Sequence, residues 1–251
     1  MRVALFTETF LPKIDGIVTV LLLLLDHLIQ REVEFMIVAP KLTDQADHYR
    51  GKKVVGVPGV RFPLYPELKI GPPTLGTYRE VKDFKPDIAH FIHPTLVGTG
   101  GMVMAKRLGI PTLASFHLDL ATIVHYLGIG FLEPAIWWYT RQNFNAADYA
   151  LAPSRLVQQN MLAHGVRNVG LWRRGVDAEQ FHPRHYSAAM RARLSAGHPD
   201  ETILLYVGRL SNEKQIVSIK AVLERVPGTR LALVGDGPAR ASLQAQFAGV
   251  P

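Results

Sequence analysis

Residues 1–30 read MRVALFTETFLPKIDGIVTVLLLLLDHLIQ and contain the pattern that decides the fold. The first seven residues are mostly apolar, which is typical of a strand buried on both faces of a parallel sheet. A loop follows, and residues 17–30 then have the length and apolar content of a core helix. A strand, a loop and a helix in this order form the repeating unit of α/β folds.

The same order recurs along the chain. Further strands are expected in VEFMIVAP, KKVVGVPGV, DIAHFI, PTLASFH, DYALAPS and NVGLWRRGVD, and helices in LVGTGGMVMAKRLG and SRLVQQNMLAHG, with another helical region before DYALAPS. This alternation predicts an α/β fold with a parallel sheet covered on both faces.

The domain organisation follows from a change in pattern near residue 183. We expect a Rossmann-like first domain over residues 1–182, a polar linker over 183–200, and a second strand–helix alternation over 201–251. Two strands are too few to close a doubly wound core, so this second Rossmann-like domain is expected to be partial and the chain to be a fragment.

Composition excludes several classes of site. The chain has 251 residues and no cysteine, which excludes disulfides, zinc–thiolate sites, iron–sulfur clusters and cysteine nucleophiles. The absence of cysteine is consistent with a reducing compartment such as the cytoplasm. The longest apolar run, residues 17–25, is half of the ~18 residues that a membrane span requires. The protein is therefore expected to be soluble or peripheral on a membrane.

Positive charge is concentrated in one stretch. The formal net charge is +7, and between residues 141 and 193 eight arginines stand against three acidic residues. Solvated helix faces explain most of them, and the alternative is a surface for phosphates, nucleic acid or an anionic membrane. Nucleic acid is disfavoured because no RNA-binding motif accompanies the charge. The nearby FLEPAIWWYTRQNF is interpreted as core or as an interfacial patch, since Trp137 and Trp138 cannot both face inward on one helix.

Candidate site residues lie after strands, because open α/β sheets bind ligands beyond the carboxyl ends of their strands. Gly16 precedes a helix and either admits a phosphate to the backbone N–H groups or serves a tight turn. His117 is the last residue of PTLASFH, at the end of the expected strand, and is either a ligand donor or a buried histidine. His93 follows DIAHFI and is a candidate for the cleft, whereas His90 is interpreted as a core residue.

The second domain offers two cations. In VGRLSNEK, Arg209 ends a strand and Lys214 begins an expected helix, which favours a diphosphate clamp over an ordinary ion pair with Glu213. LVGDGP is interpreted as a turn. The sequence lacks GxGxxG and Walker patterns, which disfavours dehydrogenases and P-loop NTPases, and it also lacks a nucleophile elbow, HExxH, EF-hand or DxD-like acidic pair.

These motifs converge on one family. FTETFLPKIDGIVT, GVPG with PLYPELK, LWRRGVDAEQFHPR, VGRLSNEK and LVGDGP together resemble the family 4 GT-B glycosyltransferases. Within this family, the chain is most similar to the sulfoquinovosyltransferases, the sulfolipid synthases. The segments MRARLSAGHPDETILLYVGR and FAGVP are also similar to that subgroup. Related lipid mannosyltransferases have the W-R-R-G-V-D type of segment, so the donor sugar stays open.

The resemblance implies a retaining transfer that needs no metal or other cofactor. It places the nucleotide sugar mainly on the second domain and the acceptor on the first. It implies that Gly16 lies near the donor diphosphate and His117 near the transferred sugar, while Arg209 and Lys214 stabilise the departing nucleoside diphosphate. The sequence departs from the family after His117, where Leu118 and Asp119 replace Thr-His, and the E-x7-E segment would lie beyond residue 251.

The expected function is therefore sulfolipid synthesis. A peripheral membrane enzyme in the cytoplasm would transfer sulfoquinovose from UDP-sulfoquinovose to diacylglycerol, without a nucleic-acid partner. One alternative is a GDP-mannose-dependent lipid α-mannosyltransferase. Another is an inactive fragment that binds anionic membranes through the arginine-rich stretch.

Overall fold

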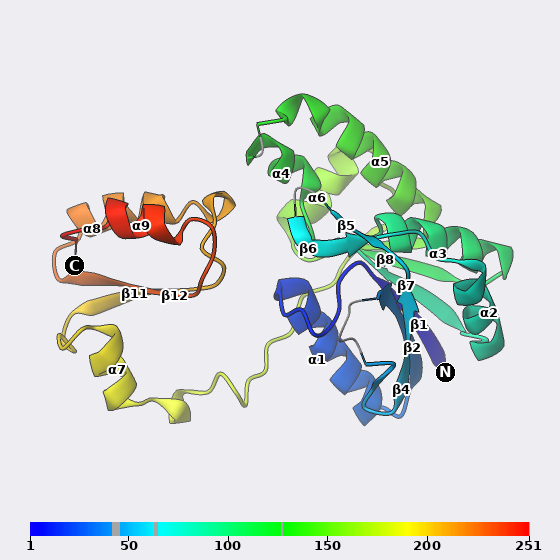
Figure 1. Ribbon diagram of the computed structural model, residues 1–251, viewed down its shortest axis with the longest axis horizontal. Helices are drawn as coiled ribbons and strands as arrows, with labels where there is room; N and C mark the ends of the chain where they lie inside the picture. Colours follow the sequence, from blue (N-terminus) through cyan, green and yellow to red (C-terminus); the bar gives the residue numbers. More distant parts are fainter. Residues whose placement is uncertain (42–45, 63–64, 127, 251) are drawn as a thin grey trace. The chain divides into compact units, whose positions relative to one another are not determined.

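A computed structural model describes residues 1–41, 46–62, 65–126 and 128–250. The chain separates into two compact units (Figure 1). Unit 1 consists of Met1–Val124 and Gly130–Asp177, and unit 2 of His125–Ile129 and Ala178–Pro251. The stretch expected to be a linker contains a 3₁₀ turn, Pro183–His185, and the short helix α7 (Ala188–Leu194).

Unit 1 is built on an eight-stranded sheet. Its strands are β1 (Arg2–Thr7), β2 (Glu34–Pro40), β3 (His48–Tyr49), β4 (Lys52–Val57), β7 (Ile88–Ile92), β8 (Thr112–Ser115), β9 (Tyr149–Ala152) and β10 (Val169–Leu171). Their order is β10-β9-β8-β7-β1-β2-β4-β3, and every pair is parallel except β3 with β4. The prediction of an α/β fold with a parallel sheet is confirmed.

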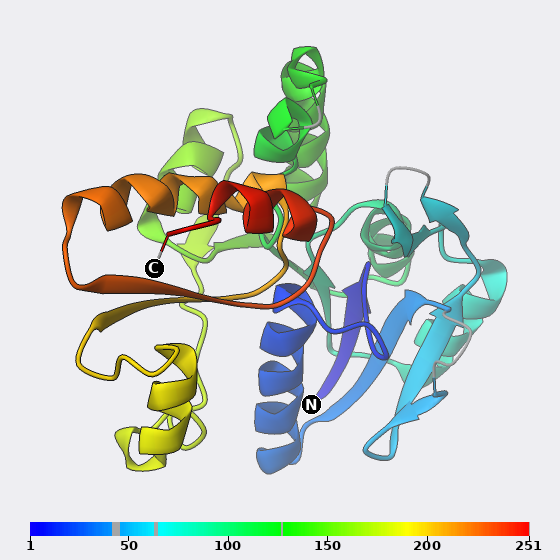
Figure 2. The same ribbon diagram turned by 60° about the vertical axis from the view of Figure 1, so that its left-hand side comes forward.

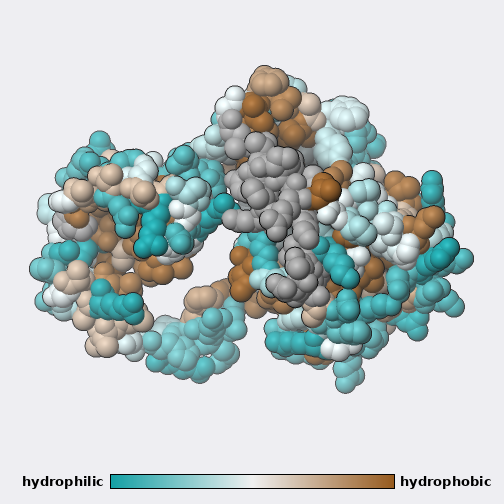
Figure 3. Space-filling view, viewed as in Figure 1, coloured by the Kyte–Doolittle hydropathy of each residue, from teal (hydrophilic) through white to brown (hydrophobic). Residues whose placement is uncertain are grey.

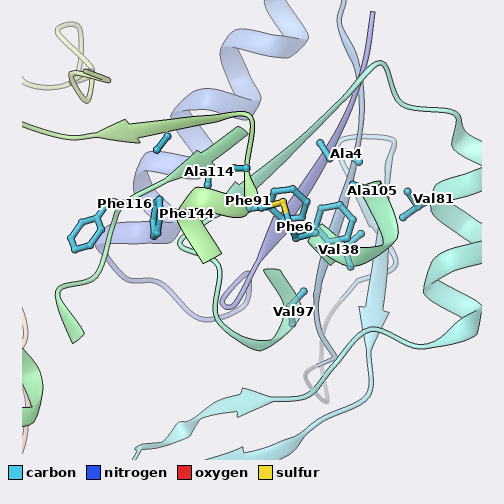
Figure 4. Close-up of a cluster of buried hydrophobic side chains, with 14 of the residues drawn as sticks. Ala4, Phe6, Val38, Val81, Phe91, Val97, Ala105, Ala114, Phe116 and Phe144 are labelled. Atoms are coloured by element: carbon cyan, nitrogen blue, oxygen red, sulfur yellow. The ribbon is translucent and has the colours of Figure 1, made fainter. Parts of the chain in front are cut away.

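Helices cover both faces of this sheet. They are α1 (Gly16–Gln30), α2 (Leu75–Phe84), α3 (Leu96–Arg107), α4 (Leu120–Tyr126), α5 (Glu133–Ala146) and α6 (Arg155–Ala163), with a 3₁₀ turn at Gly130–Leu132. On one face, Leu21 and Leu25 of α1 pack with Leu5 and other odd-numbered residues of β1 and β2. Helices α2, α3, α5 and α6 pack on the other face (Figure 2). There Phe6 and Phe91 stack with ring centroids 4.9 Å apart (Figure 4).

The sequence patterns did not predict every element of unit 1. Helix α2 and the antiparallel hairpin of β5 (Val60–Phe62) with β6 (Tyr65–Ile70) were not predicted. Helix α2 has few apolar residues and buries only Thr77 and Val81, so it lacks the apolar run that marks the other helices in the sequence. The side chain of Thr74 caps it. The PLYPELK motif begins with two residues outside the described ranges and continues into β6.

A carboxylate holds the start of α3. Glu8 Oε1 accepts hydrogen bonds from the backbone N–H groups of Thr95 (3.0 Å) and Gly98 (2.9 Å), and Oε2 accepts one from Val97 (3.2 Å). Burial raises the pKa of Glu8, while these three bonds act in the opposite direction. Because the N–H groups already have an acceptor, this glycine-rich helix start is a packing feature. A Cβ on Gly101 would lie 2.5 Å from the Phe6 ring.

Unit 2 has a smaller core. Parallel strands β11 (Thr202–Val207) and β12 (Thr229–Val234) carry 3₁₀ turns, α8 (Lys220–Arg225) and α9 (Arg240–Gln246) on one face. Leu210, Ile216 and Leu243 are buried there. Leu205 and Val207 of β11 are exposed.

We also asked whether any helix could cross a membrane. In the described part of the chain, no helix combines the length and hydropathy needed to cross a bilayer.

Glu8→Ala is expected to lower the free energy of unfolding of unit 1 by about 2 kcal/mol, because it leaves three N–H groups without their charged acceptor. Urea unfolding followed by tryptophan fluorescence measures this, since all three tryptophans belong to unit 1. The control is Glu34→Ala, which removes an exposed carboxylate paired with Lys52 at 2.6 Å. Equal effects of the two substitutions would contradict the capping role.

Candidate functional site

The carboxyl edge of the unit 1 sheet gathers several polar side chains. Glu8 follows β1, His93 follows β7, His117 follows β8 and Trp172 follows β10. Because these strands are parallel, the loops after them emerge at one edge. Of the predicted site residues in unit 1, His117 lies directly at this edge and Gly16 follows the loop after β1.

His117 is held by side-chain and backbone contacts. Its Nε2 atom lies 2.8 Å from the hydroxyl oxygen of Ser115. Its backbone N–H donates to His93 Nδ1 at 3.3 Å, and the Leu118 N–H donates to the same atom at 3.3 Å. The other ring nitrogen, His117 Nδ1, is buried and lacks a hydrogen-bond partner in the described part of the chain. It is therefore available to a ligand.

The imidazoles at this edge are neutral near pH 7. Burial lowers the pKa of His90 and His93 to about 4 each. Burial, followed by the positive charge of Arg174, lowers the pKa of His117 to about 3. Neutral imidazole offers one donor and one acceptor nitrogen, so His117 can orient a hydroxyl group and does not supply charge.

His93 has a structural role. It is buried, accepts two backbone N–H bonds and has a backbone φ of +52°. Its ring packs edge-on against Phe116 at 5.3 Å. The suggestion that His93 faces the cleft is wrong, because its Nδ1 is used to hold the loop after β8. His90 is buried, as expected from its position within a strand.

Trp172 and Arg174 are candidate site residues to which the sequence patterns assigned no role. The Trp172 ring lies edge-on to His90 at 5.6 Å and to His117 at 5.5 Å. Burial lowers the pKa of Arg174, whose charge acts on His117. The signal was the WRRG segment itself, in which a tryptophan and two arginines follow a strand.

Gly16 is the first residue of α1 and is exposed, with open space where a Cβ would stand. The helix start is already capped, since Asp15 Oδ1 accepts from the N–H groups of Ile17 (3.0 Å) and Val18 (2.9 Å). The capping aspartate was missed, although Asp directly before a helix is a strong N-cap signal. A contact between Gly16 and a diphosphate stays a prediction.

Asp119, one of the two departures from the family pattern, also caps a helix. Its carboxylate accepts from the Thr122 N–H at 3.1 Å and the Thr122 hydroxyl at 2.7 Å, at the start of α4.

In unit 2, Arg209 and Lys214 are both exposed on the segment after β11. The expectation that Lys214 begins a long helix is wrong. Lys214 ends a 3₁₀ turn, Asn212–Lys214, and Gln215 then adopts a left-handed φ of +50°. The α-helical part of EKQIVSIKAVLERV is limited to α8. Ile216, Val217 and Ile219 are β-branched, which weakens helix formation in between.

The glycines of LVGDGP allow two loops of unit 2 to touch. A Cβ on Gly235 would lie 1.9 Å from the Gly208 carbonyl oxygen, and one on Gly237 would lie 2.3 Å from the Leu210 carbonyl oxygen. The Leu210 N–H donates to the Asp236 carbonyl at 2.9 Å. The interpretation of LVGDGP as a turn is confirmed, and this turn supports the loop that carries Arg209.

The buried imidazoles predict a loss of stability in acid. In the unfolded chain a histidine binds its proton near pH 6.5, whereas these folded groups do so near pH 4 or 3. The unfolded state therefore binds more protons as pH falls, and the free energy of unfolding of unit 1 should decrease from about pH 6.5 to about pH 4.

His90→Gln should reduce the proton uptake on unfolding near pH 5 by about one proton, measured from the pH dependence of urea unfolding. The control Ser195→Ala removes a buried hydroxyl and no titratable group, so it should keep the wild-type dependence. An unchanged slope in His90→Gln would contradict the prediction.

Comparison with known proteins identifies the family of this chain. Residues 14–180 match Glycosyltransferase Family 4. A GDP-mannose-dependent alpha-mannosyltransferase of Mycobacterium tuberculosis (strain CDC 1551 / Oshkosh) is 35% identical over 97% of this chain and 65% of its own length. The sulfoquinovosyl transferase SQD2 of Arabidopsis thaliana is 32% identical over 82% of this chain and 41% of its own.

The fold is shared with solved structures. The crystal structure of Anabaena HepE in complex with UDP has a TM-score of 0.69 at 16% identity and covers 99% of this chain and 66% of that one. The predicted GT-B type of α/β fold is confirmed. The present chain spans slightly less than two thirds of the mycobacterial relative. From the matched residues and this identity, the chain belongs to Glycosyltransferase Family 4.

Proposed function

We propose that the whole protein is a retaining glycosyltransferase that moves a sugar from a nucleotide-sugar donor to a membrane lipid. The observation that carries this proposal is the neutral His117 of a family 4 chain, with its buried, unpartnered Nδ1 at the carboxyl edge of the sheet. A neutral ring nitrogen in this position suits a sugar hydroxyl better than a phosphate.

The reaction breaks the bond between the anomeric carbon and the diphosphate, and forms a bond from that carbon to the acceptor oxygen on the same face. The acceptor hydroxyl proton leaves with the departing nucleoside diphosphate. Arg209 and Lys214 would stabilise the negative charge that develops on this leaving group. Gly16 would admit the diphosphate to the backbone, and no metal or other cofactor is required for these steps.

Two donors fit these residues. Sulfoquinovose transfer from UDP-sulfoquinovose to diacylglycerol is supported by the opening motif and by the similarity to the Arabidopsis transferase. Mannose transfer from GDP-mannose is supported by the mycobacterial relative, which covers more of this chain.

Full-length protein with labelled donor and lipid acceptor tests the proposal. Label from UDP-sulfoquinovose in a diacylglycerol product supports sulfolipid synthesis. Label only from GDP-mannose supports the mannosyltransferase. If the full-length protein transfers neither sugar to any lipid, the proposal of lipid glycosylation is overturned. The remaining hypothesis is then an inactive protein that binds anionic membranes.

Arg209→Ala in the full-length enzyme should lower kcat about a hundredfold, because a charged donor to the developing oxyanion is lost. The KM for the lipid acceptor should stay near the wild-type value. Initial rates at varied acceptor concentration measure both constants. Arg225→Ala removes an exposed arginine of α8 and is the matched control. Wild-type turnover in Arg209→Ala would remove this residue from the leaving-group role.

Unit 1 carries an exposed apolar surface. The aromatic tip consists of Phe131, Leu132 and Trp138, with exposed fractions of 79%, 37% and 56%, whereas Trp137 is buried. Figure 3 shows apolar residues gathered where α4 and the start of α5 lie in Figure 1. Exposed aromatic side chains of this kind insert into the interface of a bilayer. We propose that this tip docks on the cytoplasmic surface of an anionic membrane.

The arginine-rich stretch contributes unevenly to such docking. Arg184 pairs with Glu179 at 2.5 Å, and Arg191 donates to the carbonyl oxygens of Pro199 (2.7 Å) and Glu201 (3.0 Å). The arginines at 155, 167 and 173 are exposed on unit 1, the unit that carries the tip.

The double substitution Phe131→Ala and Trp138→Ala should lower partitioning onto anionic vesicles at least about tenfold, because two interfacial aromatic side chains are lost. Co-sedimentation at increasing salt measures it, and salt should weaken wild-type binding. The control Leu75→Ala removes an apolar side chain of equal exposure, 78%, from α2. Equal partitioning of the double variant and the control would show that the tip does not dock.

A further inference from the structure

Ser115 stands between two imidazole rings. Its hydroxyl oxygen lies 2.8 Å from His117 Nε2 and 2.9 Å from His90 Nε2. Ser115 ends β8 and is fully buried, and His90 lies within the neighbouring strand β7. The next acceptor within reach is the Phe91 carbonyl oxygen, at the longer distance of 3.5 Å.

The number of protons available to Ser115, His90 and His117 limits how they can form hydrogen bonds with one another. A serine hydroxyl has one proton to donate and can accept two hydrogen bonds. Each neutral imidazole carries one proton, on either Nδ1 or Nε2. When the hydroxyl donates to one Nε2 atom, the other bond forms only if the second Nε2 is protonated. Because the Phe91 carbonyl oxygen is much farther away, at 3.5 Å, the hydroxyl donates to one of the two imidazoles. His90 and His117 then carry one Nε2 proton between them.

The surrounding contacts leave His117 little freedom to turn. His93 Nδ1 accepts its backbone N–H, and Trp172 packs edge-on against the rings of both His90 and His117. Ser115 therefore sets the ring orientation and the side of the imidazole that carries the proton. The consequence appears at Nδ1, the buried atom without a partner in the described part of the chain.

We propose that Ser115, anchored by His90, is a positioning residue that holds the His117 ring and determines whether its Nδ1 donates to or accepts from the transferred sugar. This inference rests on the proposed function, because it assigns the sugar as the partner of Nδ1. Ser115 itself touches no substrate and acts through His117.

Nitrogen-15 NMR of the 251-residue chain tests the hydrogen-bonded triplet without any activity. The long-range ring spectra should show one protonated and one unprotonated Nε2 for His90 and His117 near pH 7. Ser115→Ala should shift or mix the tautomers of His117. Ser195→Ala, which removes another fully buried hydroxyl, should leave them unchanged. Protonation of both Nε2 atoms, or an unchanged His117 spectrum in Ser115→Ala, would overturn the proposal.

Kinetics of the full-length enzyme test whether Ser115 affects sugar transfer through His117. Ser115→Ala should lower kcat ten- to a hundredfold, roughly the cost of a misplaced positioning group, with little change in the KM of the lipid acceptor. Ser115→Thr keeps the hydroxyl and should recover most of kcat. Equal losses in the alanine and threonine variants would overturn the role of the hydroxyl. If the NMR result holds and no donor is used, the proposed function has failed and the Ser115 triplet stands.

Discussion

Parallel pairing of β7 with β1 and β8 is the constraint on which the rest of unit 1 depends. In this register Thr7 lies opposite Ile92, and Ile92 lies opposite Ser115. The three strands therefore end together, and the loops that follow them start side by side. Glu8, His93 and His117 share one edge for this reason, although they are far apart in the sequence.

Burial at that edge has a further consequence, because buried polar groups must find partners. Glu8 finds them in the N–H groups of α3, and His93 in the backbone of the loop after β8. Ser115 finds them in two imidazole rings. His117 Nδ1 departs from this pattern, and a ligand that bonds to it would remove the cost of its burial.

Unit 2 presents its cations differently. Arg209 and Lys214 are exposed on a segment whose start is fixed by close backbone contacts, which only glycine at positions 235 and 237 allows. A diphosphate is common to UDP-sulfoquinovose and GDP-mannose, so these two residues suit either donor. Discrimination between the donors must therefore rest on other groups that contact the sugar or the base.

The sequence by itself determined the alternation of strands and helices, the parallel sheet, and the placement of His117 at the end of a strand. These features follow from hydrophobic runs and turn signals that are local in the chain. Helix α2 was not predicted because it buries only two residues. The prediction of a helix starting at Lys214 was wrong because Gln215 has a left-handed backbone and the residues after it are β-branched. The partners of Glu8, of His93 and of the Ser115 triplet were decided only by the tertiary structure. Apart from the bond between Ser115 and His117, these contacts join residues that are 24 to 90 positions apart, and such contacts are set by strand order and register.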